Sequence, residues 1–203
     1  MFPQNGSKIP ELRFKGFADP WEQRKLGAIS DIYDGTHQTP IYKNTGIPFL
    51  NVENIRTLRT NKFISREDFK KSFKIFPHKG DILMTRIGDV GTTNIIKDNT
   101  PVAYYVSLAL LHPHKYCDAL FSKNLIESEN VSREIWKKAL HVAFPKKINK
   151  VDIGKIPVLL PSKTEQQKEG LCLEYLDKII AANQRKVEKL KELKKGYMQK
   201  MFC

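Results

Sequence analysis

The sequence predicts an α+β protein in which a β-rich globular domain is followed by one long C-terminal α-helix. Short apolar runs bounded by glycine and proline, which are typical of strands, recur between residues 47 and 160. Residues 162–203 instead carry apolar side chains at steps of three and four, which is the period of a helix. The 203 residues are enough for one self-sufficient core and such an appendage.

The first fifty residues begin with a segment that has little regular structure of its own. Residues 1–20 are punctuated by proline and glycine, so we expect an extended lead-in. Residues 21–29 should form a short helix or turn. Residues 34–40 read Asp-Gly-Thr-His-Gln-Thr-Pro, a loop composition in which Asp-Gly is a strong turn signal. The apolar residues 47–52 predict a strand with one buried face.

The middle of the chain is basic and aromatic before it returns to strands. Within residues 59–79 we expect a short helix that begins at Ser65, because Asp68 follows three residues later in a capping arrangement. Residues 81–86 predict a strand, and residues 92–96 are expected to return beside it as the second strand of a hairpin.

The remaining part of the globular domain mixes both kinds of element. Residues 102–111 predict a third β segment, and the apolar spacing from 121 to 143 favours a helix. Residues 144–150 should break that helix, and residues 153–160 predict a final short strand. The domain is expected to cover residues 21–161.

The long helix begins at Ser162, since Ser-Lys-Thr-Glu forms a capping box directly behind a proline. A helix over residues 162–203 would be about 55–60 Å long, longer than the preceding domain is wide. Its apolar face consists of Leu176, Ile179, Ile180, Val187, Leu190, Leu193 and Tyr197, with Asn183 among them. We expect this face to pack on a partner helix; the alternative is a helix folded back on its own domain. Asn183 either sets the register of the pair or faces solvent.

The charge of the chain indicates a polyanionic partner. Lysine and arginine number 35 against 22 acidic residues, a formal net charge of +13, so nucleic acid is favoured over an anionic membrane surface. No stretch approaches the roughly 20 apolar residues that span a bilayer. The N-terminus lacks the apolar run of a signal peptide, and three widely spaced cysteines fit a reducing compartment. We therefore expect a cytoplasmic protein.

Patterns that would indicate catalysis are weak. Glu192–Lys194 has a spacing found in nucleases, but such triplets arise constantly in charged helices. Gly88–Thr92 is rich in glycine yet lacks the lysine of a phosphate-binding loop. His112, His114 and Cys117 have no convincing fourth zinc ligand. We predict a binding protein with no catalytic residue, metal or cofactor.

Residues suited to DNA contact lie mostly in predicted loops. Lysines would contact phosphates, and side chains with paired donors and acceptors would read base edges. The candidates are Thr36, His37, Gln38, Lys43, Arg86, Asn94, Lys146, Lys147, Asn149 and Lys150. Arg86 has an alternative role as a structural ion pair with Asp89 or Asp81, and Thr36 has one in shaping its turn.

Several segments, in order, resemble the specificity (S) subunits of type I restriction–modification systems. They are Pro10–Phe14, Trp21–Glu22, Lys25–Gly27, Asp34–Pro40, Gly46–Leu50, Gly80–Thr92, Lys147–Asn149, Leu159–Pro161, Glu165–Lys168, Leu176–Asp177 and Lys194–Phe202. Each segment is weak by itself, but the ordered set covers nearly the whole chain.

The resemblance implies a target recognition domain that reads one half of a split sequence in double-stranded DNA. It also implies an antiparallel two-helix coiled coil with a second half, and docking of methylation (M) and restriction (R) subunits that hold the catalytic sites. Such subunits usually carry both halves in one chain of about twice this length. This chain would be either a half-subunit that dimerises or the first half of a longer one. The alternative is a stand-alone dimeric DNA-binding protein. Deleting residues 162–203 should leave a folded, monomeric domain.

Overall fold

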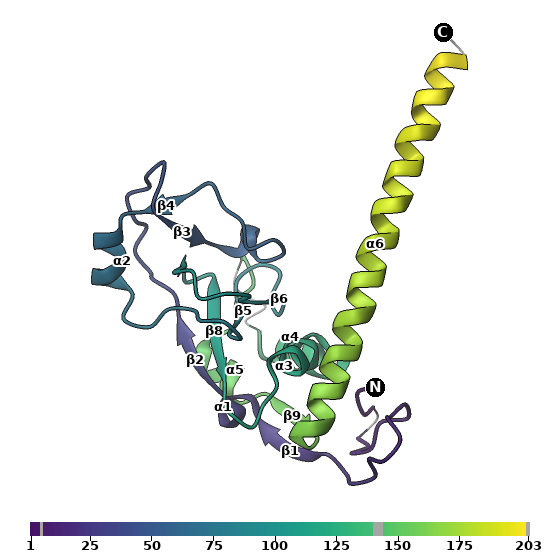
Figure 1. The fold of residues 1–203 in the computed structure, drawn as a ribbon. Coiled ribbons are helices and arrows are strands. Elements are labelled where there is room, and N and C mark those ends of the chain that lie inside the picture. The colour runs from purple at the N-terminus through teal and green to yellow at the C-terminus, as the bar shows by residue number, and fades with distance from the viewer. Residues whose placement is uncertain (5, 140–143, 202–203) are drawn as a thin grey trace.

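The computed structural model describes residues 1–4, 6–139 and 144–201 (Figure 1). Its central layer is an antiparallel sheet of four strands in the order β2-β8-β5-β6. These strands are β2 (Ser30–Asp34), β8 (Leu108–Pro113), β5 (Ile82–Thr85) and β6 (Thr93–Ile95).

Two smaller sheets flank this layer. The first has the order β4-β3-β7 and forms a lobe with the helix α2 and a short 3-10 helix. Its elements are β3 (Ile47–Leu50), η1 (Val52–Asn54), β4 (Phe63–Ile64), α2 (Arg66–Ser72) and β7 (Ala103–Tyr104). The second pairs β1 (Glu22–Lys25) with β9 (Pro157–Leu160). The remaining helices are α1 (Leu26–Ile29), α3 (Ala119–Glu127), α4 (Glu129–Lys138), α5 (Lys150–Gly154) and α6 (Lys163–Met201).

The central sheet is buried on both faces, because successive side chains of a strand point to opposite sides. In β5, Ile82 and Met84 join the core beneath the helices, whereas Leu83 joins the core beneath the lobe. The same alternation sends Leu111 and Leu110 of β8 to opposite cores. The sheet therefore fixes the lobe and the helices to one rigid layer.

The local signals of the sequence agree with the structure in several places. Ser65 caps α2, with its Oγ accepting a hydrogen bond from the Asp68 backbone N–H at 3.0 Å. The hairpin is also confirmed: β5 and β6 pair antiparallel, with Leu83 opposite Asn94.

Other predicted elements differ because tertiary pairing divides them. The segment 102–111 is two strands, β7 and β8, which belong to different sheets. The predicted helix over 121–143 breaks at Ser128, whose backbone is extended, and its last residues, 140–143, lie outside the described residues. Of the strand predicted over 153–160, only Pro157–Leu160 is a strand, since residues 150–154 form α5.

The strand β1 has no signal in the sequence. All four of its side chains, from Glu22 to Lys25, are exposed, so no apolar alternation marks it. Antiparallel pairing with β9, which is far from β1 in the sequence, holds β1 in place.

The lead-in residues pack on the start of α6 in the same chain. Ser162 caps α6, accepting from the Glu165 backbone N–H at 3.3 Å, but the Glu165 carboxylate turns to Arg13. The Arg13 guanidinium donates to both carboxylate oxygens, at 2.6 and 2.8 Å. At the other end of the lead-in, the Phe2 ring packs on the ring of Trp21. The segment thus ties the base of α6 to the domain.

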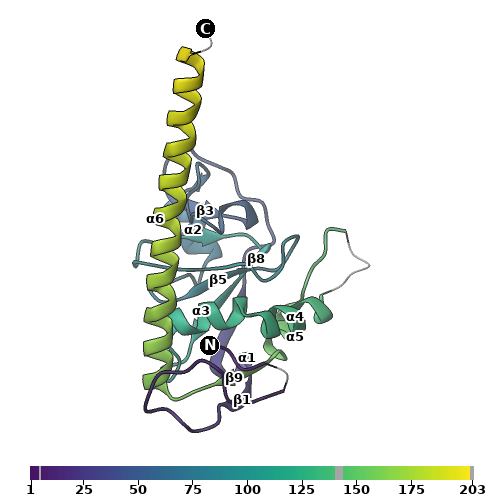
Figure 2. The ribbon, with the colours of Figure 1, turned by 90° about the vertical axis from the view of Figure 1, so that its right-hand side faces the viewer.

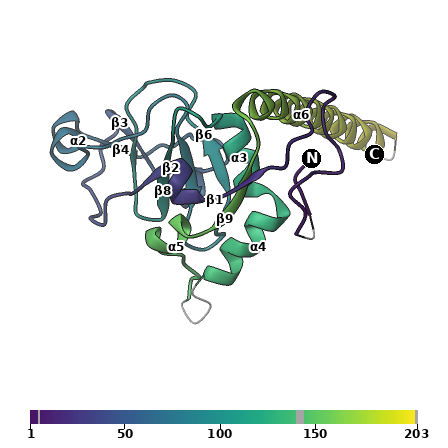
Figure 3. The ribbon, with the colours of Figure 1, turned by 90° about the horizontal axis from the view of Figure 1, so that it is seen from below.

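The first turns of α6 belong to the core. Asp118 caps α3, and its backbone N–H donates to the Gln166 side-chain oxygen at 2.8 Å. At Gly170 the two helices approach so closely that a Cβ would lie 2.8 Å from the Phe121 nitrogen. Figure 3 shows α3 between α6 and the sheet. Deleting residues 162–203 would therefore remove part of the domain, and a truncation that spares the core must keep the chain through Glu174.

Beyond these turns the helix leaves the domain (Figure 1). Every residue from Tyr175 to Met201 is exposed except Ala181 and Gly196, which are half-buried. The apolar face is exposed with the rest, at 46% for Leu176 and 64% for Leu190. The alternative of a helix folded back on its own domain is therefore wrong. Within the described part of the chain, no helix is long and apolar enough to cross a membrane.

The base of α6 should make stability depend on pH. Glu169 is fully buried and its carboxylate oxygens have no hydrogen-bond partner among the described residues. Burial, with repulsion from Glu165, raises its pKa from 4.5 to about 7, although the N-terminal amine and Arg13 oppose the shift. Between about pH 4.5 and pH 7, the folded chain therefore holds a proton on Glu169 that the unfolded chain has already lost. This contribution to stability is lost as the pH rises through about 7.

Glu169→Gln is expected to raise the free energy of unfolding at pH 8 by roughly 2 kcal/mol, and by little at pH 5. Urea denaturation at pH 5, 6, 7 and 8 measures this difference. Glu188→Gln, on the exposed part of α6, is the control and should change stability equally little at each pH. A difference between wild type and Glu169→Gln that is the same at pH 5 and pH 8 would contradict this account of the carboxyl.

Candidate nucleic-acid interface

Four chain segments meet side by side at one end of the central sheet. The Thr36 carbonyl accepts from the Val106 N–H at 2.9 Å, and the Arg86 N–H donates to the Ser107 carbonyl at 2.9 Å. The Ile148 N–H in turn donates to the Arg86 carbonyl at 2.9 Å. We call this surface, formed by residues 35–38, 105–107, 86–89 and 144–150, the sheet-end surface. It brings together the candidates Thr36, His37, Gln38, Arg86, Lys146, Lys147, Asn149 and Lys150.

The first segment presents two polar side chains to solvent. Gly35 lies so close to the connection between β7 and β8 that a Cβ would meet the Tyr105 carbonyl at 2.5 Å, so only glycine fits. Thr36 closes the following turn, its Oγ1 accepting from the Gln38 N–H at 3.2 Å. His37 and Gln38 are exposed, and no described residue hydrogen-bonds the Gln38 amide. Gln38 therefore has a free donor and acceptor, whereas Thr36 shapes the turn.

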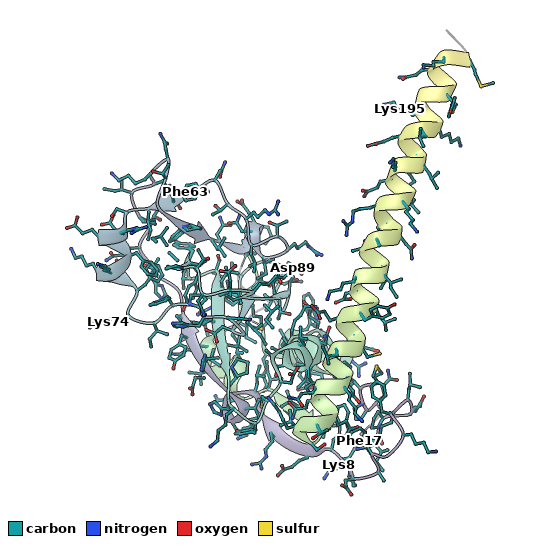
Figure 4. All side chains as sticks on the ribbon, in the orientation of Figure 1. Lys8, Phe17, Phe63, Lys74, Asp89 and Lys195 are labelled. Carbon is teal, nitrogen blue, oxygen red and sulfur yellow. The ribbon has the colours of Figure 1, made fainter. Side chains whose placement is uncertain are left out.

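The second segment is a tight turn between β5 and β6. Gly88 and Gly91 have φ of +81° and +102°, which favours glycine at both positions. The Thr85 hydroxyl donates to the Asp89 carbonyl inside the turn, and the Thr92 hydroxyl donates to the Asp89 carboxylate at 2.8 Å. In Figure 4, Asp89 lies on the side of the domain that faces α6. The turn is rigid and has no features of a phosphate-binding loop.

Arg86 is a structural residue in this arrangement. Its guanidinium donates to the Asp34 carboxylate, and only 11% of the side chain is exposed. Burial lowers its pKa below the usual value. The ion-pair partner of Arg86 is therefore Asp34, and not Asp81 or Asp89, the two carboxylates that the sequence predicted. Asp81 instead accepts from the His78 N–H and lies 2.6 Å from His112 Nδ1.

The last segment supplies most of the positive charge. Lys147 pairs with Ile87 in an isolated bridge, and the Gly88 N–H donates to the Lys146 carbonyl at 2.8 Å. Asn149 and Lys150 are exposed where α5 begins, and the Asn149 side chain makes no capping bond. The backbone is thus fixed while these polar groups remain open to solvent.

Two candidates lie away from the sheet-end surface. The Asn94 amide donates to the carbonyls of Ile55 and Arg56 at 2.8 and 3.1 Å, so it holds the lobe loop and has no free donor. Lys43 is exposed on the lobe, where its N–H donates to the Phe63 carbonyl at 2.8 Å. Arg56, which the sequence did not single out, has a side chain 79% exposed beside Asp89. In the sequence, only its positive charge marked Arg56 as a possible DNA contact.

The histidines that might have bound metal are engaged with different carboxylates. His112 lies against Asp81, and His114 Nε2 lies 3.2 Å from Asp31. No group of three or more metal-ligating side chains occurs among the described residues. Both histidines lie where β8 ends.

The fold and the basic sheet end define an α+β recognition module with a projecting helix. The family model described as the type I restriction modification DNA specificity domain matches residues 18–192. The chain belongs to this family. Specificity subunits of these systems recognise DNA and are not catalytic.

The chain is also similar to a curated protein in sequence and to solved structures in fold. The chain is 24% identical, over 91% of its length, to a putative specificity subunit of the type I restriction enzyme MjaX of Methanocaldococcus jannaschii, and covers 46% of that protein. The HsdS subunit of Thermoanaerobacter tengcongensis matches 91% of the chain at 22% identity with a TM-score of 0.65. The S subunit of a type I restriction–modification system from M. genitalium matches 85% of the chain at 14% identity with a TM-score of 0.59. The chain spans less than half of each.

Arg86→Ala is expected to destabilise the domain and to leave DNA sequence preference unchanged. The substitution removes the partner of the Asp34 carboxylate, so the free energy of unfolding should fall by about 1–3 kcal/mol in urea titrations. Arg56→Ala, which removes an exposed guanidinium, should change it by less than about 0.5 kcal/mol. Unchanged stability together with an altered base preference would contradict the structural role of Arg86 and show that it contacts bases.

Proposed function

We propose that this chain acts in the cytoplasm as one half of a type I specificity unit. Its globular domain recognises one part of a bipartite double-stranded DNA sequence, and α6 pairs antiparallel with the equivalent helix of a second half. Methylation and restriction subunits bound to this assembly carry out the chemistry. Family membership supports DNA recognition, and the exposed α6 supports the pairing.

The observation that carries the proposal is the exposed apolar face of α6. Leu176, Ile179, Val187 and Leu190 are between 39% and 64% exposed, and they recur along one side of the helix. Helices in proteins gain most of their stability from packing such a face against another element. A second helix with the same spacing would bury it, with heptad-like packing.

The free part of α6 has a length suited to spacing two recognition domains. Residues 175–201 would extend about 40 Å at 1.5 Å per residue. Antiparallel pairing would place one domain at each end, related by an approximate two-fold axis. Half-sites on one face of DNA repeat at about 34 Å, one helical turn. Two copies of this chain would then read an interrupted palindrome, and two different halves an asymmetric sequence.

The sheet-end surface is the part of the domain best suited to contact DNA. It carries Lys146, Lys147 and Lys150 for phosphate contact and the free Gln38 amide for base contact, all on a backbone held by the central sheet. Asn94 and Arg86 are outside this proposal because their side chains are used within the fold.

Leu190→Glu is expected to prevent pairing. A charge buried in the seam without a partner costs several kcal/mol, so the dimer dissociation constant should rise at least about 100-fold. Gln199→Glu is the matched control, because nine residues turn a helix by 900°, which places position 199 opposite position 190. Light scattering after gel filtration measures the molar mass.

The chain cut after Glu174 should behave as a folded monomer and bind DNA weakly. If Leu190→Glu pairs as well as Gln199→Glu, the proposed seam is incorrect. A wild type that is monomeric at high micromolar concentration would exclude pairing of two copies and favour a different second half.

DNA binding is expected to fall steeply with salt, because phosphate contacts release counterions. Lys146→Ala with Lys147→Ala should weaken binding to every duplex and reduce the salt slope by about 2. The control is Lys8→Ala with Lys15→Ala, the same change of charge in the exposed lead-in. Fluorescence anisotropy on a duplex selected from a random pool, and on its scrambled counterpart, measures both effects.

Gln38→Ala should instead change which sequence the chain selects. Equal losses on the selected and scrambled duplexes would place Gln38 among the phosphate contacts.

Co-purification of a methylation subunit from the native host would support the assembly. Its absence, with DNA binding intact, would favour the alternative of a stand-alone dimeric DNA-binding protein.

A further inference from the structure

Two large aromatic side chains, one in the sheet-end surface and one next to it, are exposed to solvent. Phe144 is fully exposed, and Trp136 of α4 is 50% exposed. Most of the other large aromatics pack in one of the two cores: Trp21, Phe49, Phe121 and Tyr104 are at most 2% exposed. Figure 2 places α4 and α5 on the side of the domain away from α6, so pairing of α6 would not cover this region.

The surroundings of these rings are strongly basic. The Lys146 Nζ lies 3.7 Å from the centre of the Trp136 ring, a cation–π contact that holds the ammonium group in place. Lys138, Lys147 and Lys150 are close in sequence to the two rings, and the ion pairs among the described residues include none of these three. Lysine is depleted at the centre of protein–protein interfaces, whereas a polyanion favours it. We call the two rings and the lysines Lys138, Lys146, Lys147 and Lys150 the aromatic–basic patch. The chemistry of this patch fits DNA.

The position of the patch relative to Gln38 fits a neighbouring groove. From Thr36 to Ile148 the sheet-end ladder crosses three strand spacings, roughly 14 Å at about 4.8 Å each. The major groove is about 12 Å wide. With Gln38 in the major groove, the backbone at Ile148 therefore lies near the phosphates at the groove's edge. Phe144, four residues earlier in the chain, can reach the adjacent minor groove from there. Apolar side chains that enter the minor groove pack against sugars and base steps.

We propose that Trp136 and Phe144 form a second DNA contact, in which Phe144 enters the minor groove beside the site read by Gln38. Lys146, held over Trp136, and Lys147 bind the phosphates on the groove's edges. This inference rests on the proposed function and adds residues that contact the duplex outside the major groove.

The two tryptophans of the chain provide a direct test. Trp21 is 1% exposed and Trp136 is 50% exposed, so acrylamide quenching of the native protein reports on Trp136. We expect a saturating 30-base-pair selected duplex to reduce this quenching several-fold, with binding followed in the same samples by anisotropy of a fluorescein label on the DNA.

Phe144→Ala should weaken binding of the selected duplex about 10-fold. Leu12→Ala, an exposed apolar residue of the lead-in, is the matched control and should bind as wild type does. Neither change should alter the melting temperature, because both side chains are exposed.

The outcomes separate the two proposals. A duplex that binds while Trp136 stays equally quenchable, with Phe144→Ala binding like Leu12→Ala, overturns this inference and leaves the proposed function intact. Failure of the wild-type chain to bind any duplex overturns both.

Discussion

The structure depends on how the first turns of α6 are fixed to the globular domain. Gln166 accepts a hydrogen bond from the N–H of Asp118, the N-cap of α3, and Gly170 lets the two helices touch along their backbones. The Arg13–Glu165 pair then secures the same turns from the other side. The half-buried residues at this base end at Glu174, and one further ion pair joins Asp177 to Lys123 of α3 at 3.5 Å. The helix is therefore directed at its base and free along its outer half. A recognition surface and a pairing helix are thereby held in one orientation.

This junction combines strong packing with an unusual electrostatic cost. Glu165 is satisfied by two hydrogen bonds from Arg13, but the buried Glu169 carboxylate has none among the described residues. An unpartnered buried charge is unfavourable, and the raised pKa of Glu169 follows from that burial. Glu169 lies in the turns that join the domain to the helix, so the protonation of its carboxyl changes the stability of this junction.

The sheet-end surface arises from pairing between segments distant in the sequence. Thr36, Ser107, Arg86 and Ile148 come from four parts of the chain and are joined by main-chain hydrogen bonds. Main-chain bonds leave the side chains of the intervening turns free, so polar groups such as Gln38 and Lys147 face solvent from a rigid support. Arg86 is the exception, because its side chain turns inward to Asp34.

Local signals predicted the α2 cap, the β5–β6 hairpin, the start of α6 and its apolar face, because capping and periodicity depend on residues a few positions apart. They failed for β1, whose exposed side chains carry no pattern, and for residues 102–111, which two sheets divide.

Among the candidate site residues, the sequence identified the chemical type but not the use of each side chain. Asn94 and Gln38 have the same kind of amide, yet one is bonded to two carbonyls and the other is free. By itself, then, the sequence determined the class of fold, the positive charge and the amphipathic helix. Only the tertiary structure decided which loops meet, which polar groups are already bonded and where α6 leaves the domain, since these depend on contacts between residues far apart in the chain.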